Sequence, residues 1–589
     1  MNINNLKKRV MKTNFRNMAW MLAATLAMTA CSDSLDEASG NGNPNELIGD
    51  KGYVNIGINL PTTKGNTRSF DGYDDGLEAE YKVNKVIIAL FYGDKESDAK
   101  CTHAFQIDGT DFKESGTGED NITTYSVTGV RMISAPVSSE GKKLNVYALA
   151  LINAPVDKFD IINSPADGED SGDAVLSTGL EVNNGGAAFS GTLGELNVAI
   201  DAAKIGNAST GFFMTNAAIA IGGETPSSST AQILAPISVY NSKEIAQGEA
   251  KNNPIYVERS AAKVAVTVDD DNKLIVTDEY PHYAGATVEF KKWNLQSTNK
   301  TFYPVRKVDG FDTWRTDEYK INGTNRFVGA MANPYRIFWA VDPNYNLTTP
   351  ETDLNIVATG TEPVDVSGWH GMAEVAYCAE NTTGTSTMLS ENLTSVLLQA
   401  TFTPKDAVSG SNFFMLNNVS AIYTETEFLE WATNTLINNE AAPVRALTIN
   451  PSAESSIIIS EEGIQALIND NGSALAAEKA AILLTAAGTN IKFYKGGVTY
   501  YYAAVIKHFG EDTPYEGDAA VIDYTEKKHL GRYGVVRNTW YELKINSVSG
   551  PGEPVIPETP TTPPDKKNSY INCEINVLSW AKRSQGVDL

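Results

Sequence analysis

Short segments rich in β-branched and aromatic residues recur along most of the chain, and this pattern constrains the fold more than any other feature. Stretches rich in Gly, Asn, Asp and Pro, which favour turns, separate these segments. We expect strands at residues 53–60, 82–92, 143–152, 262–268, 274–277, 286–290, 396–402, 499–506 and 540–545. Short strands at this density favour β-sandwich or transthyretin-like domains.

The length of the chain indicates more than one domain. Because 589 residues are too many for one hydrophobic core, we expect two large β-domains, at residues 69–256 and 257–550. Helical patterns cluster at residues 425–438, 460–469 and 473–485. They predict a small helical insertion in the second domain.

The N-terminus has the pattern of an export signal. Basic residues precede an apolar run, residues 18–30, that is too short to span a bilayer stably. Small residues then lead to Cys31, which is typical of a bacterial lipoprotein, so we expect removal of residues 1–30 and lipidation of Cys31. The alternative is an ordinary signal peptide with a cysteine there by chance. Residues 31–50 predict a flexible tether.

Charge and cysteine content exclude some classes of partner. The net charge of −25 would repel phosphate backbones, so we expect no nucleic acid partner. The cysteines after Cys31 are Cys101, Cys378 and Cys573, and none has metal-binding spacing. They resemble small buried hydrophobic residues, and a disulfide between Cys101 and Cys378 remains open.

Motifs of enzymes are missing from the sequence, which predicts no enzyme, no cofactor and no metal. There is no phosphate-binding loop and no nucleophile elbow. The acidic runs at residues 71–75 and 269–271 do not fit a calcium loop and are interpreted as solvated loops. The histidines are scattered without paired spacing, at His103, His282, His370, His508 and His529.

The C-terminal tail combines a proline-rich segment with one more strand. Residues 551–567 include six prolines and predict a semi-rigid spacer that ends the folded body. Beyond it, residues 570–577 alternate apolar and polar side chains as a strand does. Because a lone strand is not stable by itself, this strand needs a partner.

The tail strand and the first strand of the folded region are nearly the same. YVNIGINL at residues 53–60 and YINCEINV at residues 570–577 both begin with Tyr and share two asparagines, which we expect to point outward. The apolar faces consist of Val54, Ile56, Ile58 and Leu60 in the first segment, and of Ile571, Cys573, Ile575 and Val577 in the second. Two segments with one pattern fit one groove. The alternative is that they are two edge strands of one monomer.

Residues 61–69, which follow the first of these strands, are polar and small, and we expect them to form an exposed loop that a protease can cut. Cleavage between Arg68 and Ser69, with Lys64 as a weaker candidate, would free residues 51–68 and expose a sheet edge. The strand of a neighbour, carried on its residues 568–589, would then bind there. Such head-to-tail contacts form filaments.

Several segments resemble the major fimbrial subunits of Bacteroidales, in particular the Mfa-type fimbrilins of type V pili. The most specific is residues 533–552, YGVVRNTWYELKINSVSGPG. The others are residues 258–264, 339–345, 378–382, 501–509 and the terminal residues 570–589 with Trp580.

The resemblance implies two transthyretin-like domains, lipoprotein export to the outer membrane surface, cleavage by an arginine-specific surface protease and assembly by strand exchange into extracellular fimbriae. The implied role is a shaft subunit. Its partners would be copies of itself, tip, accessory and anchor subunits, and a host or bacterial surface receptor. The alternatives are a tip or accessory subunit, and a surface lipoprotein that binds carbohydrate.

Overall fold

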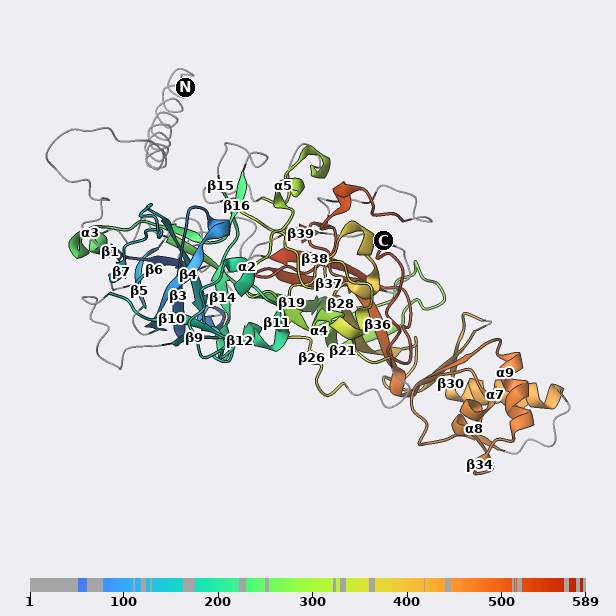
Figure 1. The fold of residues 1–589 in the computed structure, drawn as a ribbon. Coiled ribbons are helices and arrows are strands. Elements are labelled where there is room, and N and C mark those ends of the chain that lie inside the picture. The colour runs from blue at the N-terminus through green and yellow to red at the C-terminus, as the bar shows by residue number, and fades with distance from the viewer. Residues whose placement is uncertain are drawn as a thin grey trace, which may run out of the picture. The chain divides into compact units, whose positions relative to one another are not determined.

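The computed structural model describes residues 51–60, 78–109, 112–117, 123–127, 130–162, 175–221, 229–248, 254–320, 325–328, 335–359, 366–417, 419–439, 446–510, 513, 515, 522–565, 571–578 and 583–585. Residues 47–589 form one compact unit. The structure is mainly β, as the strand pattern predicts (Figure 1). The boundaries of the expected domains stay a prediction.

A large sheet organises the first hydrophobic core. Its strands follow the order β4, β3, β8, β14, β18, β2, β6, β5, and β17 pairs with β8. β3 and β8 are buried along nearly their whole length, which explains their continuous apolar sequences. The strands are β2 (Gly57–Leu60), β3 (Lys85–Gly93), β4 (Lys100–Asp108), β5 (Phe112–Thr117), β6 (Thr123–Val127), β8 (Asn145–Ile152), β14 (Met214–Asn216), β17 (Ala235–Ile237) and β18 (Pro254–Arg259).

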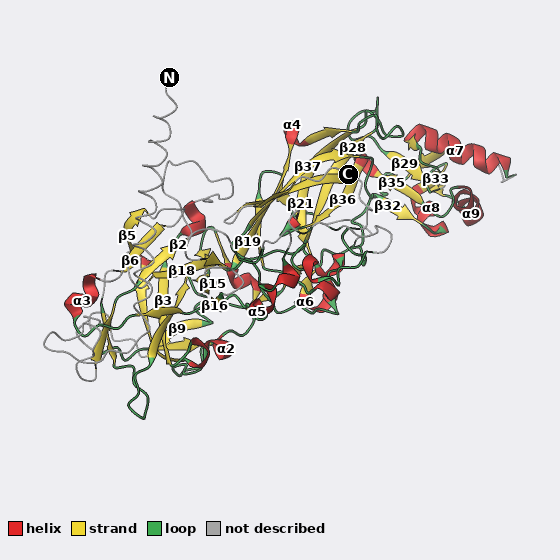
Figure 2. Ribbon diagram, turned by 90° about the horizontal axis from the view of Figure 1, so that it is seen from above, coloured by secondary structure: helices red, strands yellow, loops and turns green. Residues whose placement is uncertain are grey.

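Two sheets enclose the second core. One has the order β27, β19, β37, β38, β39, and the other has the order β20, β21, β28, β36 with β26 beside β21 (Figure 2). Alternating burial along β21 and β37 points one side of each strand into this core. The strands are β19 (Ala261–Val268), β20 (Lys273–Ile275), β21 (Thr287–Gln296), β26 (His370–Gly371), β27 (Val375–Ala379), β28 (Ser395–Thr403), β36 (Val498–Val505), β37 (Trp540–Val548), β38 (Ile571–Leu578) and β39 (Arg583–Gln585).

The predicted helical insertion is present and has a core of its own. Its helices are α7 (Glu425–Asn438), α8 (Glu461–Leu467) and α9 (Ala477–Ala486), close to the expected ranges. Thr424 and Glu427 form a capping box at the start of α7, and the Ser460 side chain caps α8. The strands are β29 (Phe413–Leu416), β30 (Ile422–Thr424), β31 (Leu447–Ile449), β32 (Ser456–Ile458), β33 (Ile468–Asp470), β34 (Ser473–Ala474) and β35 (Ile491–Tyr494).

Short elements complete the fold. Paired short strands are β1 (Lys51–Val54) with β7 (Arg131–Ser134), β9 (Phe159–Ile162) with β10 (Gly179–Val182), β11 (Ile200–Asp201) with β23 (Thr301–Phe302), β12 (Gly206–Asn207) with β13 (Gly211–Phe212), β22 (Thr298–Asn299) with β25 (Leu354–Asn355), and β15 (Ile219–Ile221) with β16 (Thr230–Gln232) and β24 (Tyr335–Arg336). Helical turns are η1 (Glu78–Tyr81), η2 (Glu96–Asp98), α2 (Leu193–Leu196), η4 (Ala202–Ile205), α3 (Lys243–Gly248), α4 (Asp269–Asn272), α5 (Phe311–Trp314), η7 (Asp317–Tyr319), α6 (Pro350–Asp353), η8 (Thr385–Thr387), η9 (Ser390–Asn392), η10 (Lys495–Gly497) and η12 (Lys527–His529).

Cys101 and Cys378 are free thiols, which answers the open disulfide question. Cys101 is buried in the first core and Cys378 in the second, so each packs as a small hydrophobic residue. Burial raises the pKa of each thiol to about 12. Over the part of the chain that the structure describes, no helix is long and apolar enough to cross a membrane.

Neighbouring residues of α7 provide a matched test of the insertion core. Leu436 is fully buried, whereas Ile437 is 58% exposed. We expect Leu436→Ala to lower the unfolding free energy of the insertion by about 2–5 kcal/mol, because it leaves a cavity. Ile437→Ala should change it by less than about 0.5 kcal/mol. Hydrogen exchange over residues 413–494 measures both, and equal effects would contradict the assigned core.

Candidate functional site

The first strand of the sequence pattern is two strands in the structure, and they join different sheets. β1 pairs antiparallel with β7, and β2 pairs parallel with β18 and antiparallel with β6. Val54, Ile56 and Ile58 are buried in the first core, with at most 2% of their surface exposed. Leu60 ends β2 opposite Thr123. The buried side chains of Val54, Ile56 and Ile58, which the sequence pattern had identified as apolar, therefore hold this segment in the first domain.

Asn55 is buried, so the expectation that it points outward is wrong. The chain leaves β1 after Val54 and enters β2 at Gly57, and this break interrupts the strict alternation of a strand. The Asn55 side-chain amide donates hydrogen bonds to the carbonyl oxygens of Ala246, at 2.9 Å, and Gln247, at 3.4 Å, in α3. Asn55 thus fixes the segment at one position along its length.

β2 lies inside the large sheet, with β18 along one edge and β6 along the other. This corrects the expectation that loss of the segment exposes one sheet edge, and it also excludes the alternative that the segment is an edge strand. Removal of β2 would leave unpaired backbone groups on both β18 and β6, and the β5–β6 hairpin reaches the rest of this sheet through β2. Such a gap accepts a strand with hydrogen bonds along both of its edges.

The terminal strand is paired within its own chain, whereas the sequence left it without a partner. β38 pairs antiparallel with β37, and β39 pairs with the other edge of β38. In the β37–β38 pairing, the apolar residues of β38 lie opposite residues of β37 that are buried in the second core. The pairs are Ile571 with Val548, Cys573 with Ile545, Ile575 with Leu543, and Val577 with Tyr541.

The proline-rich segment packs on the second domain, which corrects the expectation of a spacer that ends the folded body. Tyr500 and Glu553 exchange backbone hydrogen bonds at 2.7 and 2.9 Å. Ile556 is buried against Trp369, and the Thr562 carbonyl accepts hydrogen bonds from Ser390. We call residues 551–565 the strap. The strap carries the chain along the second domain toward β38.

A salt bridge closes the end of the strap. Asp565 accepts hydrogen bonds from the Arg532 guanidinium at 2.6 and 2.8 Å and from the Tyr524 hydroxyl at 2.6 Å. The side chains of Arg532 and Asp565 are 7% and 16% exposed, so solvent screens this pair only weakly. The contact holds the strap where residues 566–570 lead into β38.

Glu80, which follows residues 61–77 in the sequence, anchors the chain through buried contacts. Its buried carboxylate accepts from the Lys263 ammonium at 2.8 Å and from the Tyr377 hydroxyl, and its carbonyl oxygen accepts from Arg259 Nε at 2.6 Å. Burial, together with the hydrogen bond to Glu80, raises the pKa of Tyr377. The Lys263 ammonium also lies 3.8 Å from the centre of the Trp540 ring. These contacts are independent of β1 and β2.

The remaining predicted site residues lie outside the described residues. These are the lipidation residue Cys31, the cleavage residues Arg68 and Ser69, the alternative Lys64, and Trp580. Sequence reasoning missed Glu80 and the role of Asn55, because both act through partners far away in the sequence.

Two of the histidines make hydrogen bonds that support the fold. His508 bridges the Tyr541 hydroxyl at 2.7 Å and the Phe338 carbonyl at 2.8 Å, and His103 contacts the Ser134 hydroxyl at 2.9 Å. Within the described ranges, His, Cys, Asp and Glu side chains form no cluster that could hold a metal ion. Asp269, in one of the acidic runs, pairs with Lys544 at 2.8 Å.

Comparisons with known proteins give one family match. Residues 492–586 match the family described as major fimbrial subunit protein type IV, fimbrillin, C-terminal, and this region includes β36 to β39. A search of curated proteins gives no match.

Several solved structures are similar to this chain. One is a cell adhesion protein from Parabacteroides distasonis, at 12% identity and a TM-score of 0.35, covering 91% of this chain and 98% of that chain. Another is the tip fimbrial protein Mfa3 from Porphyromonas gingivalis, at 11% identity and a TM-score of 0.26, covering 89% and 99%. A third is a fimbrial assembly protein from Parabacteroides distasonis, at 15% identity and a TM-score of 0.25, covering 61% and 87%.

The anchor at Glu80 is tested by removing its cation. Lys263→Met removes the ammonium group that pairs with the buried Glu80 carboxylate, which should lower the unfolding free energy by about 3–5 kcal/mol. Lys142→Met is the control, because the Lys142–Asp94 pair is 65% and 48% exposed and should contribute less than about 1 kcal/mol. Urea denaturation measures both variants. A loss for Lys263→Met no larger than for the control would contradict the anchor.

Proposed function

We propose that this chain is a fimbrial subunit of the cell surface and that it polymerises by strand exchange as the shaft subunit. The match of residues 492–586 to the C-terminal family of the fimbrillins supports the fimbrial role. In this proposal β1 and β2 leave the subunit after proteolysis. The terminal strand of a neighbouring copy then takes their position. The observation that carries the proposal is that β2 is paired along both edges and has a close sequence copy at β38.

The energetics of the exchange depend on the difference between the two positions of the terminal strand. Burial of the four matching apolar side chains contributes about 1.5–3 kcal/mol each, or roughly 6–12 kcal/mol before the cost of ordering the segment. In its own chain β38 has the long β37 on one edge and the three-residue β39 on the other. Between β18 and β6 it would again have a partner strand along both edges, and each ladder hydrogen bond there contributes about 0.5–1.5 kcal/mol.

Proteolysis gives the exchange its direction. Before cleavage, residues 61–77 connect β2 covalently to η1. This link keeps β2 at a high effective concentration beside β18 and β6, so a strand from another copy competes at a disadvantage. Cleavage after Arg68 removes this advantage, while Glu80 keeps the new N-terminal region attached to β19 through Lys263. The released peptide would carry the lipid on Cys31 with it, so the subunit passes from the membrane to the fibre.

Asn55 gives the exchange a register. In the two matching segments Asn55 corresponds to Asn572. An incoming strand that places its asparagine beside α3 satisfies the Ala246 and Gln247 carbonyls that Asn55 satisfies now. A shift of one residue would instead set an apolar side chain against these carbonyls and turn the apolar face away from the core.

The strap decides how far the terminal strand reaches. Held on its own domain, it ends at Asp565, and the five residues 566–570 alone link it to β38. Detached, an extended strap adds about 3.1 Å for each residue. We therefore expect the Arg532–Asp565 contact to open when β38 transfers. The presence of both a cleavable first segment and a terminal strand supports the shaft role over a tip role.

Cleavage at Arg68 is the first test of the proposed function. Purified precursor without its signal peptide should stay monomeric and should form a ladder of oligomers in unheated gels after treatment with an arginine-specific protease. Arg68→Ala should remain monomeric under the same treatment, and Lys64→Ala, the matched control, should polymerise normally. N-terminal sequencing of the oligomers should begin at Ser69. Normal polymers from Arg68→Ala with an uncut first segment would contradict the proposal.

The register is tested by substitutions in the terminal strand. Asn572→Ala should make assembled oligomers dissociate at lower urea concentration, because about 1 kcal/mol is lost for each missing hydrogen bond to α3. Asn576→Ala, in the same strand, should have a smaller effect. Equal dissociation of the two variants would argue against the Asn55 position as the register site, while leaving strand exchange intact.

A further inference from the structure

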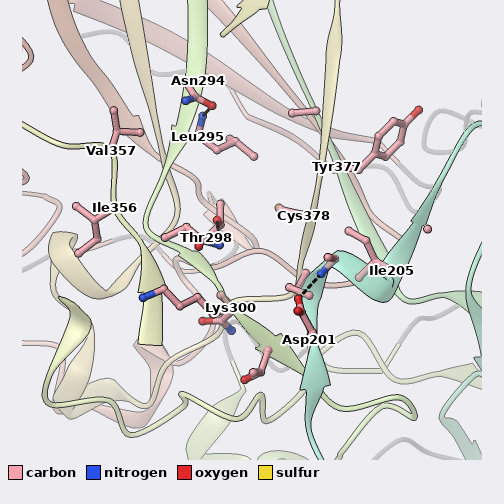
Figure 3. A pocket seen from close by; sticks show the side chains of 18 of the residues that line it. Asp201, Ile205, Asn294, Leu295, Thr298, Lys300, Ile356, Val357, Tyr377 and Cys378 are labelled. Atoms are coloured by element: carbon pink, nitrogen blue, oxygen red, sulfur yellow. Dashed lines mark hydrogen bonds between the residues drawn. The ribbon is translucent and has the colours of Figure 1, made fainter. Parts of the chain in front are cut away.

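A cavity of about 880 Å³ opens beside the second domain. Its lining comes from β21, the β22–β23 segment, β25 and β27, and from η4 of the first half of the chain (Figure 3). This volume lies within the range of about 300–1,000 Å³ that is typical of small-molecule sites. No residue that lines the cavity belongs to β2, β6, β18 or β38, so the cavity is separate from the exchange site.

Polar groups of several kinds converge on this cavity. Asn355 donates its side-chain amide to the Thr298 hydroxyl oxygen at 3.2 Å, and Asp201 accepts from the Ala203 backbone N–H at 2.8 Å. Hydrogen-bonding capacity remains at the Asn294 amide nitrogen, the Asn355 amide oxygen and the second Asp201 carboxylate oxygen, which have no protein partner among the described residues. The wall of the cavity therefore offers both hydrogen-bond donors and hydrogen-bond acceptors to a ligand.

The charges of the cavity balance. Asp201 supplies one negative charge and Lys300 one positive charge, and the Lys300 ammonium donates to the Thr352 carbonyl at 2.8 Å. The other titratable groups in the wall are His370, Tyr377 and Cys378. Burial lowers the pKa of His370, which favours the neutral imidazole at pH 7. A phosphate or a strongly cationic ligand would find no excess of opposite charge here.

Apolar side chains lie on two sides of the cavity. Figure 3 shows Ile356 and Val357 on one side, Ile205 across from them, and Thr298 between. Leu295 adds a side chain that is 9% exposed. A ligand that fits this lining has a face of C–H groups together with hydroxyl groups that both donate and accept hydrogen bonds.

We propose that this cavity binds a neutral sugar. A neutral mono- or disaccharide has the required combination of an apolar ring face and many hydroxyl groups, and it needs no net charge at the site. A lipid would leave the amide and carboxylate groups of the wall unpaired, which is unfavourable. The site would give each subunit a binding function that does not depend on polymerisation.

The test uses the monomeric precursor without its signal peptide, so that it is independent of strand exchange. Saturation-transfer NMR is measured with galactose, mannose, N-acetylglucosamine and lactose, and with sialic acid as an anionic probe. We expect at least one neutral sugar to give a signal. Thr298→Val, which removes one hydroxyl at the wall, should weaken its binding about five- to tenfold, as expected for one hydrogen bond.

Thr448→Val is the matched control, because Thr448 is exposed in the insertion and lies away from the cavity lining. This variant should bind like the unchanged protein. A second variant, Asn294→Leu, keeps the proposal testable if Thr298→Val folds poorly. Absence of a signal from every neutral sugar, binding of sialic acid alone, or unchanged sugar binding in both cavity variants would each overturn the proposal.

Discussion

Strand β2 is hydrogen-bonded along both of its edges, and the first domain depends on this position being filled. β18 runs parallel to β2 on one side and β6 antiparallel on the other, so the β5–β6 hairpin joins the rest of the sheet through β2. Ile58 at the centre of β2 is fully buried. Without a strand here, two rows of backbone groups and part of the first core would face solvent together. The position therefore selects a replacement with the same apolar pattern.

In the proposed exchange the terminal strand has two alternative positions, and the structure describes one of them, beside β37. On its own chain, β38 completes the sheet of the second core and the strap holds it there through Glu553, Thr562 and Asp565. In this state the edge of β37 is paired with β38 and is not left open to another chain. The proposed exchange would replace one set of contacts with another. Its free energy therefore depends on the difference between the binding free energies of the strand in the two positions, and not on the gross binding free energy in either position.

Local patterns predicted much of this fold. Runs rich in β-branched and aromatic residues located β19, β28, β36 and β37, and helical patterns located α7 at its observed bounds and α8 to within two residues of them. These signals are readable because they depend on residues a few positions apart. The match between the two exchange segments was also visible, since it needs only a comparison of the sequence with itself.

Features that depend on distant partners were not predictable. Asn55 is buried because α3, almost two hundred residues later, presents carbonyl groups to it. Glu80 is buried because Lys263 and Tyr377 reach it from β19 and β27. The proline-rich strap has the composition of a free spacer, yet its carbonyl groups and Ile556 find partners on the second domain. Composition describes the intrinsic preference of a segment, and tertiary contacts override it.

Cryo-electron microscopy of the mature filament tests strand exchange most directly, because the side chains of the strand between β18 and β6 identify its origin. The account predicts residues 571–578 of an adjoining subunit in that position, with Asn572 beside α3. Density for residues 57–60 of the same subunit in that position would contradict it.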